Sequence, residues 1–121
     1  MYCTYAQYQA GGGLMTETEF TRWGALAAGR IDAMTLGRAA RHAGRVADAL
    51  ALANAQMADL LRTAAHAEAT QRGLQGASNG KVSEQYRDPA EARRATDRAL
   101  YAALADALGA DEYGLLWKGV G

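Results

Sequence analysis

The sequence contains little of several residue types, and each shortage limits what the chain can be. Its one cysteine, Cys3, excludes a disulfide within the chain. One proline among 121 residues, with 21% of residues charged, argues against a disordered chain. No stretch approaches the roughly 20 apolar residues of a membrane span. The N-terminal residues lack the apolar run of a signal peptide, so neither membrane contact nor export is expected.

The charges balance, because 13 Lys and Arg residues accompany 13 Asp and Glu residues. Attachment to DNA by bulk positive charge is therefore not expected. Large apolar side chains are scarce, since alanine dominates the 50% hydrophobic fraction and Phe20 and Ile31 are the single examples of their types. A buried Leu or Phe contributes roughly 1.5–3 kcal/mol and a buried Ala much less. The composition predicts one small helical domain over residues 1–121, whose thin core either suffices alone or gains stability from neighbouring molecules.

Residues 1–15 are predicted to form an ordered arm rather than a helix, because three tyrosines are followed by three consecutive glycines. A capping box from Thr16 to Glu19 then predicts a helix to about Met34, ended by Gly37. Apolar residues recur in this helix every three or four positions and form one stripe for burial. They are Phe20, Trp23, Ala27, Ile31 and Met34.

The longest predicted helix runs from near Ala40 to about Arg72. Its apolar positions are spaced like a heptad seam, which favours packing against other helices of the same chain, with a coiled-coil oligomer as the alternative. They are Val46, Leu50, Ala53, Met57, Leu60, Leu61 and Ala64.

Residues 73–87 include three glycines and predict a loop, with a short strand or hairpin near Lys81–Tyr86. The sequence Asp88-Pro89 then predicts the start of a helix to about Leu108, with Gly109 after its end. Residues 110–121 are predicted to form an extended tail. The fold class is therefore all-α: a small bundle of three main helices with a long central helix, a protruding loop or short β-hairpin, and extended N- and C-terminal arms.

Catalytic and metal-binding patterns are missing from the sequence. His42 and His66 are separated by about 36 Å if the helix between them is continuous, so they cannot share a site within one chain. Cys3 has no histidine near it in the sequence, and neither H-E-x-x-H nor C-x-x-C is present. The triple glycine lacks the flanking residues of a phosphate-binding loop. We therefore expect neither an enzyme nor a cofactor or metal.

A basic cluster of Arg38, Arg41, His42 and Arg45 surrounds the start of the longest predicted helix. Cations are mildly unfavourable at that end of a helix, where the macrodipole is positive. A solvated basic turn is the favoured interpretation. The alternative is a surface that binds an acidic protein patch or a phosphate backbone.

The segments outside the helices carry more apolar residues than one small helical core can bury. Tyr and Trp are also frequent anchors of protein interfaces, and extended arms dock on the backbone of neighbouring molecules. We therefore predict subunit or partner contacts here, although part of the tail covering its own bundle is the alternative. The predicted contact residues are Tyr5, Tyr8, Val82, Tyr86, Leu115, Leu116, Trp117 and Val120.

Four segments together resemble the small head-tail connector proteins, also called adaptor or head-completion proteins, of long-tailed bacteriophages and prophages. The first is the opening with Tyr5, Tyr8 and the glycines, followed by the acidic capping box and Phe20. The second is Arg30-Ile-Asp-Ala-Met-Thr-Leu-Gly-Arg38, and the third is the loop Asn79-Gly-Lys-Val-Ser-Glu-Gln-Tyr86. The most specific is the closing Leu108-Gly109 with Gly114-Leu-Leu-Trp-Lys-Gly-Val120.

This resemblance implies a non-enzymatic virion protein at the head-tail interface, present in the host cytoplasm during assembly. Such proteins form a ring of about twelve copies beneath the portal protein, extend the channel through which DNA passes, and carry a tail-side connector or tail completion protein. A ring needs a head-to-tail contact between copies, which agrees with a thin core and apolar arms. The alternative function is a small helical regulator that binds nucleic acid or protein through Arg38, Arg41 and Arg45.

Overall fold

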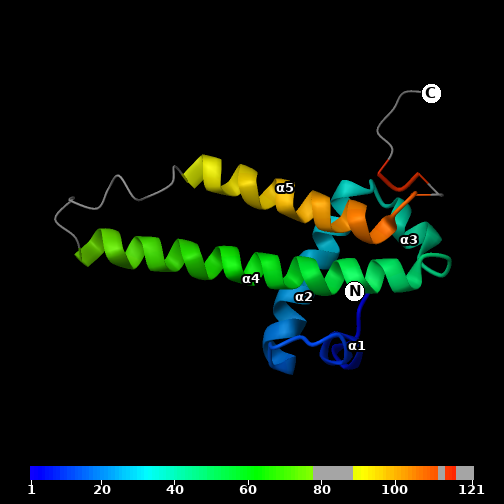
Figure 1. Cartoon of the computed structure of the whole chain (residues 1–121), viewed down its shortest axis with the longest axis horizontal. Coiled ribbons are helices and arrows are strands. Elements are labelled where there is room, and N and C mark those ends of the chain that lie inside the picture. The colour runs from blue at the N-terminus through cyan, green and yellow to red at the C-terminus, as the bar shows by residue number, and fades with distance from the viewer. Residues whose placement is uncertain (78–88, 112–113, 117–121) are drawn as a thin grey trace.

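The structure, a computed structural model, describes residues 1–77, 89–111 and 114–116, and these residues form an all-helical fold without a strand (Figure 1). The helices are α1 (Tyr5–Ala10), α2 (Glu17–Met34), α3 (Arg38–His42), α4 (Ala47–Ala77) and α5 (Pro89–Leu108). The predicted all-α class is confirmed, but the described residues form five helices instead of three. The hairpin predicted near Lys81–Tyr86 lies outside the described residues.

Helix α2 begins and ends where the sequence predicts. The amide of Glu19 donates to Thr16 Oγ1 at 3.2 Å, and the amide of Thr16 donates to Glu19 Oε1 at 3.1 Å. This capping box satisfies two of the backbone donors that every helix leaves open at its start. The helix ends at Met34, and Gly37 follows with a φ of 78°. Helix α5 likewise ends at Leu108, before Gly109 with a φ of 63°.

The prediction that residues 1–15 form an arm without a helix is wrong. Tyr5–Ala10 is helical, and Thr4 and Gln7 form a second capping box, with distances of 3.1 Å from the Gln7 amide to Thr4 Oγ1 and 2.9 Å from the Thr4 amide to Gln7 Oε1. The Thr-x-x-Gln spacing is itself a helix-start pattern. The glycines end this helix, as glycine residues commonly do.

The single helix predicted from Ala40 to Arg72 is divided into α3 and α4. The chain turns at residues 43–46, next to Gly44, and a glycine lowers helix stability by roughly 1 kcal/mol relative to alanine. The turn directs both Ala39 of α3 and Leu50 of α4 into the core, where each is fully buried. Helix α4 also extends to Ala77, so the first five residues of the predicted 73–87 loop are helical.

Helix α4 is the centre of the fold. Its most extensive contacts are with α5, which runs antiparallel along it, and with α2, which crosses it (Figure 1). The short α1 contacts both α2 and α4, near the start of α2. Helix α4 is thus the long central helix, and α2 lies across the α4/α5 pair (Figure 1).

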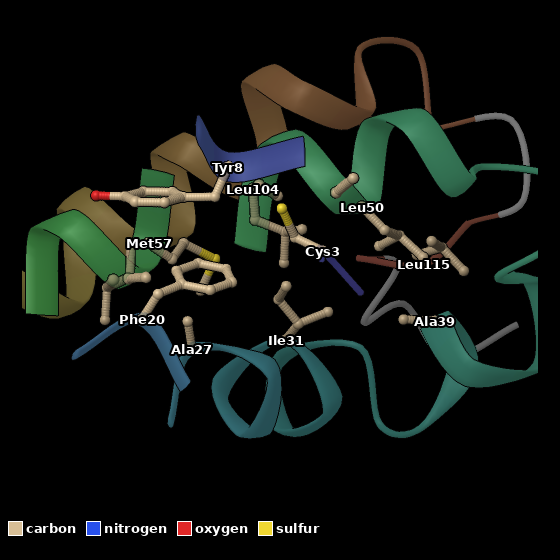
Figure 2. Close-up of a cluster of buried hydrophobic side chains, with 14 of the residues drawn as sticks. Cys3, Tyr8, Phe20, Ala27, Ile31, Ala39, Leu50, Met57, Leu104 and Leu115 are labelled. Carbon is tan, nitrogen blue, oxygen red and sulfur yellow. The ribbon is translucent and has the colours of Figure 1, made fainter. Parts of the chain in front are cut away.

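The core combines a few large side chains with alanines that let the helices approach closely. Figure 2 shows one cluster of buried side chains. They come from the helices α1 to α5 and from the segments before α1 and after α5. The fully buried large residues are Phe20, Ile31, Leu50, Met57, Leu100, Leu104 and Leu115, and the alanines without exposed surface are Ala27, Ala39, Ala53 and Ala58. Since alanine adds little transfer free energy, the seven large residues carry most of the hydrophobic stabilisation.

The α4/α5 pair continues past the point where α2 crosses it (Figure 1). We call residues 64–70 of α4 and 90–97 of α5 the hairpin end. None of these residues is buried, and the half-buried ones are alanines and Thr96. An ion pair links Arg93 to Glu68 at 3.9 Å, with both side chains more than half exposed. Exposed ion pairs contribute little to stability, so the hairpin end is held mainly by contacts between small side chains.

Candidate subunit interface

Tyr8, predicted to contact a neighbouring molecule, is instead part of the chain's own core. Its side chain is 2% exposed, and its ring stacks on Phe20 with centroids 4.5 Å apart and an interplanar angle of 16°. The ring of Tyr5 lies on the same cluster, 6.1 Å from both other rings. Residues 11–13, which we call the glycine segment, lie directly against the Tyr8 ring. A Cβ atom added at Gly13 would overlap three atoms of that ring.

The Tyr8 hydroxyl connects three parts of the chain. It accepts hydrogen bonds from the amides of Leu14 and Met15, both at 3.0 Å, and donates to Asp59 Oδ1 at 2.8 Å. Burial raises the pKa of Tyr8, and the Asp59 carboxylate raises it further, against the opposing effect of the two amides. Tyr8 therefore joins α1, the segment before α2, and α4.

The other two N-terminal tyrosines also bind within the chain. The Tyr5 hydroxyl donates to the Met15 carbonyl at 2.8 Å. The Tyr2 amide donates to Oδ1 of the fully buried Asn54 at 2.8 Å, and Asn54 Nδ2 donates to the Gly24 carbonyl at 3.0 Å. The Tyr2 hydroxyl donates to the Asp32 carboxylate. Burial, followed by this hydrogen bond and the Asp32 charge, raises the pKa of Tyr2 to about 12.

Arg38 is committed to the C-terminal segment. Its Nε and Nη2 atoms both donate to the Leu115 carbonyl, at 3.2 and 3.1 Å. The Leu115 side chain is fully buried, beside Leu50 and Ala39 (Figure 2). Leu116 is half-buried and packs against the same core. Leu115 is therefore unavailable as an interface anchor in this conformation. This agrees with the alternative expectation, in which part of the tail covers its own bundle.

The described part of the predicted extended tail, residues 110–111 and 114–116, forms a turn. Asp111 has a φ of 51°, and its carboxylate accepts hydrogen bonds from the amides of Leu115 and Leu116 at 2.7 and 2.9 Å. Gly114 follows with a φ of 61°, and its amide donates to the Asp111 carbonyl at 2.9 Å. A short polar side chain that bonds its own backbone tolerates this left-handed conformation. The turn brings the Leu115 carbonyl to Arg38.

Because the predicted helix is divided into α3 and α4, the basic cluster lies at a different helix end than the sequence predicts. Arg41 and His42 occupy the last turn of α3, where the helix dipole favours positive charge. Neither residue lies at the start of a long helix, where the helix dipole would disfavour its positive charge. Arg41 and Arg45 are exposed, while Arg38 binds the tail. The alternative regulator surface of three arginines therefore lacks the Arg38 guanidinium as a free phosphate ligand.

Among the residues whose exposure the structure describes, four leucines outside the predicted contact residues expose half or more of their surface. They are Leu14, 96% exposed, Leu36, 69% exposed, and Leu26 and Leu52, each 51% exposed. Leu36 has a φ of 54°, which costs conformational energy in a residue other than glycine. The Thr-x-Gly pattern marks this turn in the sequence, but nothing in the sequence indicates that its leucine points into solvent.

One pocket lies between α1, the glycine segment and α4. Its volume is about 320 Å³, at the lower limit of typical ligand pockets. We call it the α1–α4 pocket. Its lining residues are Cys3, Gln7, Tyr8, Gly11, Gly12, Gly13, Ala51, Leu52, Ala55, Gln56 and Asp59. Burial raises the pKa of the Cys3 thiol, so this cysteine is held as the neutral thiol and not as a reactive thiolate.

The remaining predicted contact residues, Val82, Tyr86, Trp117 and Val120, lie outside the described residues. Within the described part of the chain, no group of three or more His, Cys, Asp or Glu side chains is arranged to hold a metal ion. In the same part, no helix combines the length and apolar character needed to cross a membrane.

The chain was compared with family models, curated proteins and solved structures. No match was found in any of the three comparisons.

Proposed function

We propose that this protein is a structural subunit of the head-tail junction of a tailed bacteriophage. Copies of the chain form a ring of about twelve subunits between the portal protein and a tail-side protein. The ring extends the DNA channel and has no enzymatic role. This proposal keeps the function implied by the sequence resemblance, and it places the protein in the virion after assembly in the host cytoplasm.

The observation that carries the proposal is the contact between two of the segments that carry the resemblance. Arg38 ends the Ile-Asp…Thr-x-Gly-Arg segment, and Leu115 belongs to the closing Gly-Leu-Leu segment, 77 positions later. The two segments meet through the paired Arg38 hydrogen bonds to the Leu115 carbonyl. Thr35 supports the same corner, since its hydroxyl donates to the Ile31 carbonyl at 2.8 Å and accepts from the Ala39 amide at 3.2 Å.

Three of the exposed leucines support the assembly part of the proposal. Leu14, Leu36 and Leu52 expose half or more of their surface in a chain with few large apolar residues. Burial of such side chains between copies would add to the limited hydrophobic stabilisation of the single chain. The balanced net charge is compatible with a channel lining, since strong phosphate contacts would retain DNA instead of letting it pass.

The test is to measure the mass of the purified protein and image it by electron microscopy, with and without the portal protein of the same phage. We expect annular particles of about twelve copies, either alone or docked on the portal. A chain that stays monomeric in both conditions and does not bind the portal contradicts the proposal. Salt-sensitive binding of duplex DNA by the free chain would favour the regulator instead.

A further inference from the structure

We propose that the Leu36 corner of one copy docks into the α1–α4 pocket of the next copy, and that this contact closes the ring. The Leu36 corner comprises residues 35–37 and the adjoining helix α3. The inference rests on the proposed function and specifies the contact between subunits. Four features support this contact: the backbone of the corner, the composition of the pocket, the charges of both surfaces and their positions in the fold.

The Leu36 corner combines a left-handed backbone with an exposed apolar side chain. Leu36 has a φ of 54° and Gly37 a φ of 78°, so two consecutive residues adopt the left-handed conformation. The Leu36 side chain is then 69% exposed. An exposed leucine gains no burial energy, and the left-handed conformation disfavours a residue with a Cβ atom. Strain of this kind persists where the surrounding structure imposes it and is concentrated at functional positions.

The surroundings do impose it, because the corner is rigid on both sides. The Thr35 hydroxyl is fully buried and bonds both Ile31 of α2 and Ala39 of α3. The Gly37 amide donates to the Asp32 carbonyl at 2.9 Å. Leu36 is therefore presented as a fixed apolar projection, and little conformational entropy is lost when such a projection is buried.

The α1–α4 pocket offers a complementary surface. Half of the Leu52 side chain is exposed there, with Ala51 and Ala55 on the same helix, and the glycine segment forms the opposite wall without side chains. Leu14, which is 96% exposed, directly follows this wall. An apolar side chain that enters the pocket would cover Leu52. The residues next to that side chain in the incoming copy would reach Leu14.

The charges of the two surfaces are opposite in sign. The pocket lining contains one charged residue, Asp59, which is exposed, and no Lys or Arg. From Thr35 to Val46 the chain carries three arginines and no Asp or Glu. The proposed contact pairs the exposed Arg41, on α3 beside the corner, with Asp59 of the next copy, whose Oδ1 also accepts from the Tyr8 hydroxyl of its own chain. Opposite charges guide association and disfavour pairing of two corners or two pockets with each other.

The positions of the two surfaces select a neighbouring copy as the occupant. The pocket lies on the α1 side of α4, where Tyr8 stacks on Phe20 near the start of α2. The corner follows the other end of α2, which crosses α4 between them (Figure 1). From Phe20 to Met34 the helix spans about 21 Å. A corner therefore cannot reach the pocket of its own chain, and a contact between different surfaces of successive copies produces a ring when its rotation closes.

The first experiment measures assembly of the full chain, alone and with portal protein, by mass and electron microscopy. Leu36→Gly removes the side chain and relieves the left-handed strain, so it does not impair folding of the subunit. We expect it to weaken association of copies by about tenfold or more. Leu52→Arg should weaken it similarly. Leu26→Gln alters an equally exposed leucine outside both surfaces and should assemble like the wild type.

The second experiment identifies the contact by cross-linking in a Cys3→Ala background. The double variant Leu36→Cys and Leu52→Cys should form a ladder of disulfide-linked multimers under oxidising conditions, because each copy links to two different neighbours. Each single variant should form no ladder. Efficient dimers of Leu52→Cys alone would mean that pockets face each other and would overturn the proposal.

The outcomes separate this contact from the proposed function. Rings that form normally with Leu36→Gly, and without a ladder in the double variant, refute the docking of Leu36 and leave the connector function standing on another contact. Assembly that depends on Leu36 without any binding to portal supports the contact and contradicts the connector function. A wild-type chain that remains monomeric in all conditions refutes both.

Discussion

Gly13 provides the sharpest test of how the N-terminal segment is held, because its lack of a side chain is what allows the chain to close over Tyr8. A methyl group at this position would overlap the Tyr8 ring. The ring has little freedom to move, since it stacks on Phe20 and its hydroxyl makes three hydrogen bonds. Gly13→Ala therefore forces the glycine segment and the ring apart.

The expected cost has two parts. Overpacking of a filled core costs about 1–3 kcal/mol. Displacement of the hydroxyl leaves the buried Met15 amide without its acceptor, which costs about 1–3 kcal/mol more. Because partial relaxation reduces both, we expect Gly13→Ala to lower the free energy of unfolding by about 2–4 kcal/mol.

The free energy of unfolding is measured by urea titration with circular dichroism as the signal. Gly29→Ala is the matched control, because Gly29 lies exposed within α2 with open space around its Cβ position. That variant should gain about 0.5–1 kcal/mol. In a Tyr8→Leu background the cost of Gly13→Ala should fall by at least half, because the overlapping ring atoms are gone. An unchanged cost in that background, or a Gly13→Ala variant as stable as the wild type, would refute the reasoning.

Three further predictions concern the links between distant segments. Arg38→Ala should lower the free energy of unfolding by about 1–2 kcal/mol through loss of the paired bonds to Leu115, whereas exposed Arg41→Ala should change it by less than about 0.5 kcal/mol in the same urea titration. The Tyr2 pKa of about 12 lies above its usual value of 10, so the stability it contributes is complete below pH 10 and is lost as the pH rises toward 12. Urea titrations across that range should show a smaller loss for Tyr2→Phe than for the wild type. Asn54→Asp keeps the acceptor for the Tyr2 amide but directs a carboxylate oxygen at the Gly24 carbonyl. The thermal midpoint of this variant should fall by several degrees. A midpoint equal to that of the wild type would count against the buried pair of hydrogen bonds.

Helix limits that depend on neighbouring residues could be predicted from the sequence. The Thr16–Glu19 capping box and the left-handed Gly37 and Gly109 positions are determined within a few residues, and the structure confirms all three. The same rule applied to Thr4 and Gln7 would have identified α1. In residues 1–15 the capping pattern determines the local structure, whereas the tyrosine and glycine composition does not.

The division between α3 and α4 could not be derived from local preference. Alanine and arginine favour helix on both sides of Gly44, and a single glycine is tolerated in many helices. The decision depends on distant partners: Arg38 reaches Leu115, and Ala39 and Leu50 are both buried in the core cluster that also contains Leu115. Such contacts are invisible to a reading of sequence periodicity.

The sequence did not predict which apolar side chains lie on the surface. Leu14, Leu26, Leu36 and Leu52 are at least half exposed and were not among the predicted contact residues. The predicted contact residues Tyr8, from the N-terminal segment, and Leu115, from the tail, instead fill the core. Alanine explains the difference, because small side chains on α2 and α4 leave room that aromatic rings and tail residues occupy.

The hairpin end has a consequence for how the molecule fluctuates. Its two helices touch through alanine and threonine, and the first fully buried residues of α5 are Leu100 and Leu104. Separating the tips therefore exposes little apolar area and breaks few contacts, whereas separation at Leu100 opens the centre of the fold. Backbone amides near Thr70 and Ala92 should exchange with deuterated solvent by local opening, long before those beside Met57. We therefore expect the tips of α4 and α5 to open locally while the contacts around Leu100 and Leu104 stay closed.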